Sequence, residues 1–247
     1  MGEASTAGDA PATTGDDSPK ARRRRRIDEL LAAPLREGRG QVTLASGRTL
    51  DYRVDAGFLP VHAEGLDAGE PIAAVMATSY RLTDADARSR PVCFAFNGGP
   101  GSASVWLQLG ALGPRRIVVP DDGAAARGPH ALADNPHTWL EHVDRVFIDP
   151  PHTGWSVALD DDARKTLLSV DGDAKALAEV MRVWLTRHKR WGSPIVLAGE
   201  SYGTTRAAVL ADGMLAGGLD VAGVVLVSCA MDLQTLVFGP AHDLPYA

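Results

Sequence analysis

The sequence contains few cysteines and no long apolar segment, and its histidines are not spaced as metal ligands are. Its 247 residues include two cysteines and seven histidines, and the formal net charge is −6. Two cysteines exclude a disulfide framework, and no apolar run approaches the roughly 18 residues that a membrane span needs. The histidines lack metal-ligand spacing. We therefore expect no metal, no organic cofactor, no membrane span and no nucleic-acid partner.

The two cysteines fall in separate apolar segments near the middle and the end of the chain. Cys93 and Cys229 are each expected in a buried strand, and the fold should keep the two strands apart. Reduced, buried thiols suit a reducing compartment. The sequence thus favours a cytoplasmic location.

The N-terminus differs from the rest of the chain. Residues 1–20 consist mainly of small and polar residues with no aromatic, and an unbroken basic run follows from Arg22 to Arg26. Such composition predicts a disordered tail over residues 1–26, with an anionic docking site as the alternative reading of the arginines. The next apolar segment is too short for an export signal. Residues 27–247 could fill one large α/β domain.

A possible nucleophile lies at residues 199–203, which read Gly-Glu-Ser-Tyr-Gly. An apolar run precedes this segment and a helical stretch follows it, and this strand, turn and helix context is typical of a nucleophile elbow. The flanking glycines let strand and helix approach closely, so that the Ser201 hydroxyl is held out at the sheet edge. The alternative is a glycine-rich turn with a capping serine.

A second glycine-rich turn supplies candidate backbone donors. Residues 91–96 predict a buried strand that runs into Asn97, Gly98, Gly99, Pro100 and Gly101. An acyl-transfer enzyme needs N–H donors for the oxyanion of its tetrahedral intermediate. One donor follows the nucleophile, here Tyr202, and the other comes from an earlier strand-to-helix loop, where Gly99 is placed.

Four motifs in fixed order carry a resemblance to a known family. They are FNGGPGS (residues 96–102, with LGP at 112–114), NPHTW (135–139), VDRVFIDPP (143–151, with GWS at 154–156) and GESYG (199–203). Together they resemble the serine carboxypeptidase family, in a bacterial-type form. The resemblance implies an α/β-hydrolase fold, a sheet with flanking helices, and removal of single residues from peptide carboxyl termini.

The resemblance also implies roles for individual residues. Ser201 matches the nucleophile, and Gly99 and Tyr202 match the oxyanion-hole amides. Asn97 and Glu200 match residues that bind the substrate's terminal carboxylate, assisted by the Gly98 amide. The family's second glutamate, which pairs with the one in the elbow, is replaced here by Ala111. This departure puts selectivity for free carboxyl termini in question.

The acid and the base expected of the triad are not in their usual places. In α/β-hydrolases they follow the nucleophile along the chain, and only 247 − 201 = 46 residues follow Ser201. We expect the chain to be the N-terminal portion of the domain, truncated after the strand at residues 221–227. A compact triad with Asp232 and His242 is the alternative, and it requires a histidine within about 3 Å of the hydroxyl.

These observations predict a serine-type carboxypeptidase acting on a peptide or a small acyl substrate. As this fragment it should be inactive, and a missing C-terminal half is the partner that we expect. An esterase or acyltransferase on the same scaffold, or a non-catalytic fragment or pseudoenzyme, are the alternatives.

One rival belongs to another class of protein. The glycines at 99 and 101, the helix after them, and Asp121 about 20 residues on have the outline of a dinucleotide-binding fingerprint. The position of the third glycine is occupied by Ser104. The rival also leaves the elbow at Ser201 unexplained.

The remaining pattern predicts a hairpin, two further strands and a helix. Residues 41–61 alternate around Ser46 and Gly47, which predicts a hairpin, and residues 71–82 and 143–148 predict two further strands. Apolar residues recur at helical spacing from Ala174 to His188, with Asp171 as the expected cap.

Overall fold

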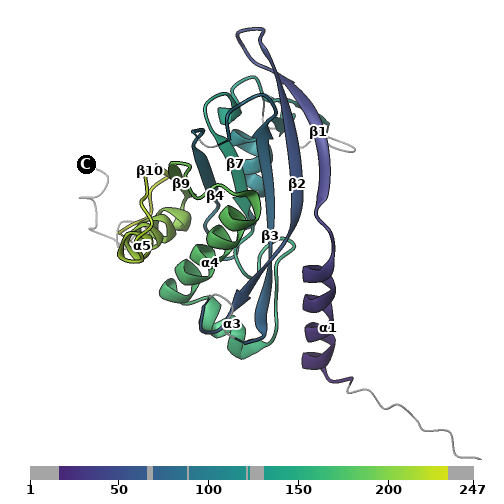
Figure 1. The fold of residues 1–247 in the computed structure, drawn as a ribbon, viewed down its shortest axis with the longest axis vertical. Coiled ribbons are helices and arrows are strands. Elements are labelled where there is room, and N and C mark those ends of the chain that lie inside the picture. The colour runs from purple at the N-terminus through teal and green to yellow at the C-terminus, as the bar shows by residue number, and fades with distance from the viewer. Residues whose placement is uncertain (1–16, 66–68, 88, 121, 123–130, 233–247) are drawn as a thin grey trace, which may run out of the picture.

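The computed structural model describes residues 17–65, 69–87, 89–120, 122 and 131–232. Eight strands form one mixed sheet, and helices cover both of its faces (Figure 1). The strand order along the main path is β1-β2-β3-β7-β4-β9-β10, with β8 paired to β3. The α/β sheet with flanking helices that the motifs implied is therefore confirmed.

The antiparallel part of the sheet comes from the N-terminal third of the chain. It contains β1 (Arg36–Thr43), β2 (Thr49–His62) and β3 (Pro71–Leu82), and the short β8 (Val157–Ala158) pairs with β3. In β1 and β2, Thr43 lies opposite Thr49, so the turn falls where Ser46 and Gly47 predicted it. Both the hairpin and the strand at 71–82 are confirmed.

The parallel part places the glycine loop beside the predicted elbow. It contains β7 (Asp144–Ile148), β4 (Val92–Phe96), β9 (Ile195–Glu200) and β10 (Gly223–Val227). After β4 the chain forms β7 on one side and then crosses back to form β9 on the other. Ligands of open α/β sheets bind where the strand order reverses in this way. The carboxyl ends of β4 and β9 meet at that point.

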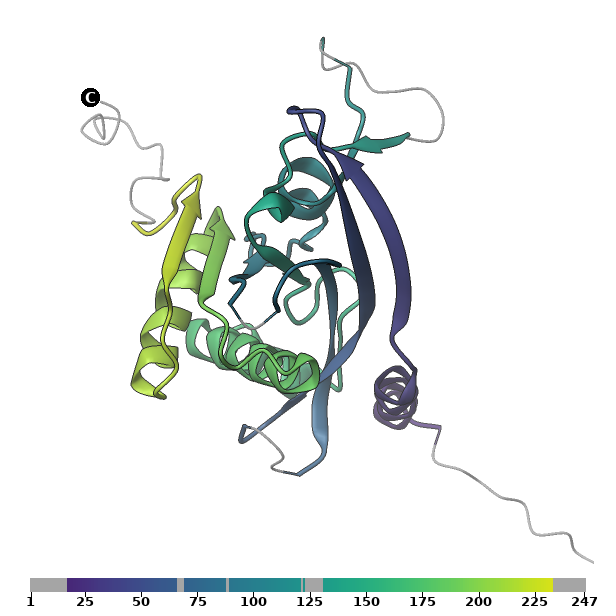
Figure 2. The same ribbon diagram turned by 45° about the horizontal axis from the view of Figure 1, so that its top comes forward.

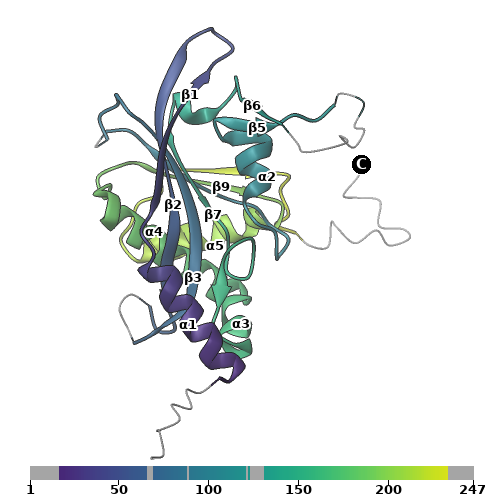
Figure 3. The same cartoon turned by 90° about the vertical axis from the view of Figure 1, so that its right-hand side faces the viewer.

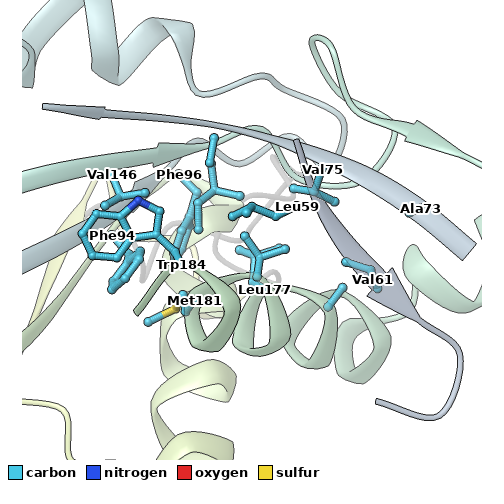
Figure 4. Close-up of a cluster of buried hydrophobic side chains, with 14 of the residues drawn as sticks. Leu59, Val61, Ala73, Val75, Phe94, Phe96, Val146, Leu177, Met181 and Trp184 are labelled. Carbon is cyan, nitrogen blue, oxygen red and sulfur yellow. The ribbon is translucent and has the colours of Figure 1, made fainter. Parts of the chain in front are cut away.

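The helices divide between the two faces of the sheet. One face carries α1 (Pro19–Ala32), α3 (Asp161–Leu167), α4 (Val170–His188) and α5 (Tyr202–Ala216), and the larger apolar core lies beneath them. Figure 4 shows Trp184, Met181 and Leu177 of α4 in this core against Phe94 and Phe96 of β4. The other face is covered by α2 (Val105–Leu107), a π-helical turn (Gln108–Leu112) and a 3-10 turn (Trp139–Glu141). Figure 3 shows α1 at one end of the molecule, beside α3, and α2 farther along it, near β5 and β6.

The long helix α4 begins slightly earlier than expected. Ser169, not Asp171, is its cap, and the Ser169 hydroxyl accepts a hydrogen bond from the Gly172 amide at 3.1 Å. Asp171 and Asp173 lie in the first turn, where carboxylates favour the positive end of the helix dipole. Lys189, in a left-handed conformation with φ 56°, ends the helix. The predicted apolar stripe is buried along the sheet.

The basic run differs from its prediction. Arg22 to Arg26 lie inside α1 and not in a disordered tail; residues 1–16 of that predicted tail lie outside the described residues. Pro19 occupies the first turn and the Ser18 hydroxyl caps it, and arginine is a good helix former. Ile27 and Leu30 then bury one side of the helix against the core. The burial of this short apolar face stabilises the helix. The predominance of arginine and polar residues in the composition gave no indication of it.

The dinucleotide rival is overturned by the segment after α2. β5 (Arg115–Ile117) does not return to the main sheet beside β4, but pairs only with β6 (Leu132–Asp134) in a separate two-stranded sheet. A dinucleotide fold needs that strand parallel to β4 and next to it. Asp121 lies outside the described residues.

The two cysteines are both free, but only one is buried. Cys93 lies in β4, while Cys229 is exposed and follows the end of β10, contrary to the prediction of two buried strands. β10 lies at the outside of the sheet, beside β9 (Figure 2). In the segment after it, Cys229 is exposed while the neighbouring Ala230 is buried against Thr204 and Thr205 of α5. None of the helices in that part of the chain combines the length and apolarity needed to cross a bilayer.

Candidate active site

Ser201 sits at a strained corner between β9 and α5. Its backbone angles are φ 56° and ψ −127°, a region that side-chain-bearing residues rarely adopt. The Ser201 amide donates to the Val227 carbonyl of β10 at 2.9 Å, and its carbonyl accepts from the Thr204 hydroxyl at 2.7 Å. Strain of this kind persists only where the surroundings hold it, and it concentrates at functional sites. The predicted elbow geometry is therefore confirmed.

Three glycines make this corner sterically feasible. A Cβ atom on Gly199 would collide with the Gly203 carbonyl, and one on Gly203 would lie 2.8 Å from the Phe96 carbonyl oxygen. On Gly98 it would lie 2.7 Å from the Glu200 carbonyl oxygen and would also meet the Tyr202 amide. The glycine loop after β4 thus packs directly against the elbow, backbone to backbone.

Asn97 and Glu200, which are 103 positions apart in sequence, form a hydrogen-bonded pair beside Ser201. The Asn97 Nδ2 donates to Glu200 Oε2 at 2.9 Å, and Asn97 Oδ1 accepts from the Leu107 amide at 3.0 Å. The Leu107 bond fixes which end of the Asn97 amide faces Glu200. An amide nitrogen has two donors, so Asn97 keeps one that these bonds do not use.

The loop that carries Gly99 is held from below by Asp149. The Asp149 carboxylate accepts from the Ser104 amide at 2.9 Å and from the Trp155 amide at 3.3 Å. Burial raises the pKa of Asp149, and these two backbone bonds oppose the rise. Gly99 itself has φ 104°. Two of the family-like segments, the glycine loop and residues 149–156, are thereby joined through one side chain.

A third family-like segment clamps the end of the helix that follows the loop. Asn135 Nδ2 donates to the Ala111 carbonyl at 2.7 Å and to the Gly113 carbonyl at 2.8 Å. The Thr138 hydroxyl donates to the Leu112 carbonyl at 3.0 Å. Ala111 is exposed in the π-helical turn. The position that the resemblance assigned to a second glutamate therefore lacks a carboxylate.

Sequence reasoning missed two charged residues behind the site. Arg206 of α5 and Asp173 of α4 form an ion pair at 2.6 Å, and their side chains are 2% and 7% exposed. Burial raises the pKa of Asp173 while Arg206 opposes the rise. The sequence did offer one signal, an arginine within the apolar stretch that follows the elbow. Because arginine is seldom buried without a partner, it indicated a buried acidic residue nearby.

The hydroxyl of Ser201 has no base among the residues that the structure describes. No side chain there forms a hydrogen bond with it. His242, the histidine of the alternative compact triad, lies outside the described residues, whereas its proposed partner Asp232 is exposed beyond the end of β10. The described part of the chain brings together Ser201, Gly98, Asn97 and Glu200, and it contains no cluster of three or more potential metal ligands.

The hollows of the molecule do not compete with this assignment. One of about 580 Å³ lies between β2 and α4 and contains none of the predicted site residues. Its charged wall includes Glu179, whose carboxylate accepts from His62 at 2.6 Å. The pairing of His62 with Glu179 explains these two buried charged groups without a ligand.

A strand, a strained serine and a helix at the reversal of a parallel sheet define the class of α/β-hydrolases. The family model described as serine carboxypeptidase matches residues 78–221. The chain belongs to the serine carboxypeptidase family, which is a family of enzymes.

Individual relatives agree with the family. The chain is 24% identical over 156 residues to "Serine carboxypeptidase-like 5" of Arabidopsis thaliana, covering 62% of this chain and 33% of that protein. It is 30% identical over 179 residues to "Pheromone-processing carboxypeptidase KEX1" of Coprinopsis cinerea, covering 69% and 27%. The chain thus spans about a third or less of the curated relatives it matches.

A solved structure supports the fold independently. The prohormone-processing carboxypeptidase KEX1(delta)p of Saccharomyces cerevisiae aligns with a TM-score of 0.57 over 70% of this chain and 38% of that one. Its sequence identity is 22%. At this level of identity the similarity concerns the fold.

Proposed function

We propose that Ser201 is the nucleophile of a carboxypeptidase that releases the last residue of a peptide. The observation that carries the proposal is the Asn97–Glu200 hydrogen bond next to the strained Ser201. The resemblance assigns these two side chains to the terminal carboxylate of the substrate. In this proposal the second N–H of the Asn97 amide donates to an oxygen of the substrate. An esterase that reads only the acyl side would not need this pair.

In the proposed reaction the Ser201 oxygen attacks the carbonyl carbon of the last peptide bond. The hydroxyl proton passes to a histidine outside the described residues, and the negative charge moves to the carbonyl oxygen. The Gly99 and Tyr202 amides stabilise this oxyanion. The peptide C–N bond then breaks, the protonated base returns the proton to the departing amine, and water later hydrolyses the acyl-enzyme.

The terminal carboxylate of the substrate would bind to Asn97, Gly98 and Glu200. Two carboxylates at hydrogen-bond distance cannot both stay ionised cheaply, so one proton must be shared between Glu200 and the substrate. Affinity for a free-acid peptide should therefore fall as the pH rises, whereas affinity for the matching amide should not. If the pH profiles of affinity for acid and amide run parallel, and Glu200→Gln leaves both unchanged, an esterase or acyltransferase is favoured. The absence of a carboxylate at Ala111 favours the same alternative.

Turnover by this chain alone tests where the base lies. A serine hydroxyl without a base is a weak nucleophile at neutral pH, so hydrolysis of a blocked dipeptide or a nitrophenyl ester should be near background. Addition of a polypeptide with the remaining part of the domain should restore it, and Ser201→Ala should abolish the restored activity. Robust activity of the chain alone that is lost in both Ser201→Ala and His242→Ala would establish the compact triad instead. Peptide binding without any turnover in the complemented protein would indicate a pseudoenzyme.

A further inference from the structure

The buried guanidinium of Arg206 contacts both segments that build the candidate site. Its Nε donates to Asp173 Oδ2 at 2.6 Å and its Nη1 donates to the Asn97 carbonyl at 2.5 Å. The guanidinium carbon lies 5.2 Å from the centre of the Tyr202 ring and 5.6 Å from that of Phe96. One side chain of α5 thus touches the end of β4, the elbow and the first turn of α4.

The bond to the Asn97 carbonyl fixes more than one atom. The peptide between Asn97 and Gly98 is planar and trans, so its C=O and N–H point in opposite directions. When Arg206 holds the carbonyl in the protein interior, the Gly98 N–H must face the other way. Gly98 N–H is one of the donors proposed for the substrate carboxylate, and the Asn97 side chain on the same residue is another.

Asp173 determines the direction of the guanidinium. It accepts from Nε, which leaves the far edge of the planar fork aimed at Asn97. Asp173 is itself fixed in the first turn of α4. A lysine at position 206 would keep the charge but could not serve both acceptors in this rigid geometry.

We propose that Arg206, held by Asp173, is a positioning residue that orients the Asn97–Gly98 peptide for binding of the substrate carboxylate. The proposal rests on the function proposed above. A merely structural ion pair between α4 and α5 would stabilise the fold without affecting recognition of a free carboxyl terminus.

The variant Arg206→Lys tests the proposal, and Arg190→Lys is its matched control. Arg190 forms an equally buried ion pair with Asp144 at 2.6 Å, with both side chains 3% exposed, but it has no contact with Asn97. Each full-length variant is first checked by thermal unfolding. Asp173→Asn is the second variant, and it should act in the same direction with a smaller effect.

Two measurements are compared with the wild-type chain. Hydrogen exchange at the Gly98 and Gly99 amides should be about tenfold faster in Arg206→Lys, while the amides of β2 and β3 keep their wild-type rates. The preference for N-acetyl-dialanine over its amide, measured as a ratio of Kd values at mildly acidic pH, should fall about tenfold. Arg190→Lys should leave both quantities at the glycine loop unchanged.

The outcomes separate this proposal from the function on which it rests. If the wild-type chain binds N-acetyl-dialanine and its amide equally, the proposed function is contradicted. The positioning role of Arg206 in carboxylate binding is then contradicted as well. If the wild-type chain prefers the acid and Arg206→Lys keeps that preference, only the positioning role is overturned. The same conclusion follows if exchange rises uniformly over the sheet or does not rise at Gly98.

Discussion

Ser201 has two flanks that are built very differently. Towards β4, the Gly98 backbone touches the elbow, and Asn97 is hydrogen-bonded to both Glu200 and Arg206. Towards β10, one backbone bond joins Ser201 to Val227, and beyond it no described strand pairs with the outer edge of β10. Figure 2 shows this contrast, with β10 at the outside of the sheet and β4 within it.

The difference separates two tasks of a serine hydrolase. The closed flank contains the groups that would bind the oxyanion and the carboxylate, and these must be rigid because misplacement by about 1 Å is costly to catalysis. The open flank is the outer edge of the sheet in the part of the chain that the structure describes. The base that would activate Ser201 is not among the described residues, so the closed flank is the part of the site that the described residues complete by themselves.

The largest effect should come from breaking the closed flank with Gly98→Ala. The added methyl group would meet backbone atoms of Glu200, Tyr202 and Gly203, which cannot move aside as a flexible side chain would. We expect a loss of about 3 kcal/mol in the free energy of unfolding, measured by denaturant titration. Gly110→Ala is the control, because nothing lies within 4 Å of a Cβ at that glycine. Equal stability of the two variants would contradict the close packing of loop and elbow.

Titration of His188 should destabilise the protein at a site distant from both flanks of Ser201, so the stability of the two flanks can be compared as the pH falls. His188 ends α4, about 22 Å along the helix from Asp173, and lies 3.4 Å from Asp55 and against the ring of Trp184. Burial lowers the pKa of His188 from 6.5 to about 4, with Asp55 opposing and nearby arginines assisting the shift.

The sign follows from proton binding. Between about pH 6.5 and pH 4 the unfolded chain binds a proton at His188 that the folded chain does not, so stability falls as the pH falls through this window. The contribution of His188 should be about 3 kcal/mol. Denaturant midpoints of wild-type and His188→Gln chains at pH 7 and pH 4 test it. Hydrogen exchange on both flanks of Ser201 should respond together, and an unchanged slope in His188→Gln would contradict the assignment.

A smaller effect should come from relieving the strain at the corner itself. Ser201→Gly removes the side chain from a backbone conformation with φ 56°, whereas Ser201→Ala keeps the strain. The glycine variant should be about 1 kcal/mol more stable than the alanine variant. Thermal or chemical unfolding of the pair measures the difference. If the alanine variant were the more stable of the two, the strain at Ser201 would not be real.

The smallest effect concerns the open flank. Val224 and Leu226 on β10 are each 41% exposed, and an uncovered apolar edge strand promotes association. Leu226→Lys should raise the concentration at which the chain associates by a factor of about three. Leu215→Lys, at a 54% exposed leucine on α5, should change it much less. Light scattering over a concentration series distinguishes the two, and equal effects would mean that β10 is not the associating edge.

Local chemistry explains why much of this molecule could be predicted. The elbow, the hairpin around Ser46 and Gly47, and the strand at residues 71–82 follow from apolar periodicity and from glycine at positions where a side chain would collide or be strained. These requirements act over a few residues, so the sequence displays them directly. The order of four motifs was enough to indicate the family that the comparisons confirmed.

Contacts between distant segments were beyond local reasoning. The basic run became a helix because Ile27 and Leu30 found a core to bury in, and β5 left the main sheet to pair with β6. Cys229 proved exposed because it follows the end of β10, and it is the next residue, Ala230, that packs against α5. Each outcome depended on a surface supplied by another part of the chain.

By itself, the sequence determined the elbow at Ser201, the glycine loop and the alternation of strands and helices, since each needs only particular residue types at short spacing. Only the tertiary structure determined that Asn97 pairs with Glu200, and that Arg206 of α5 and Asp173 of α4 meet behind them. Asn97 is 103 residues from Glu200 and 109 from Arg206. The physical reason is that a buried charge or amide requires a partner but does not specify which one, and the folded sheet makes that choice.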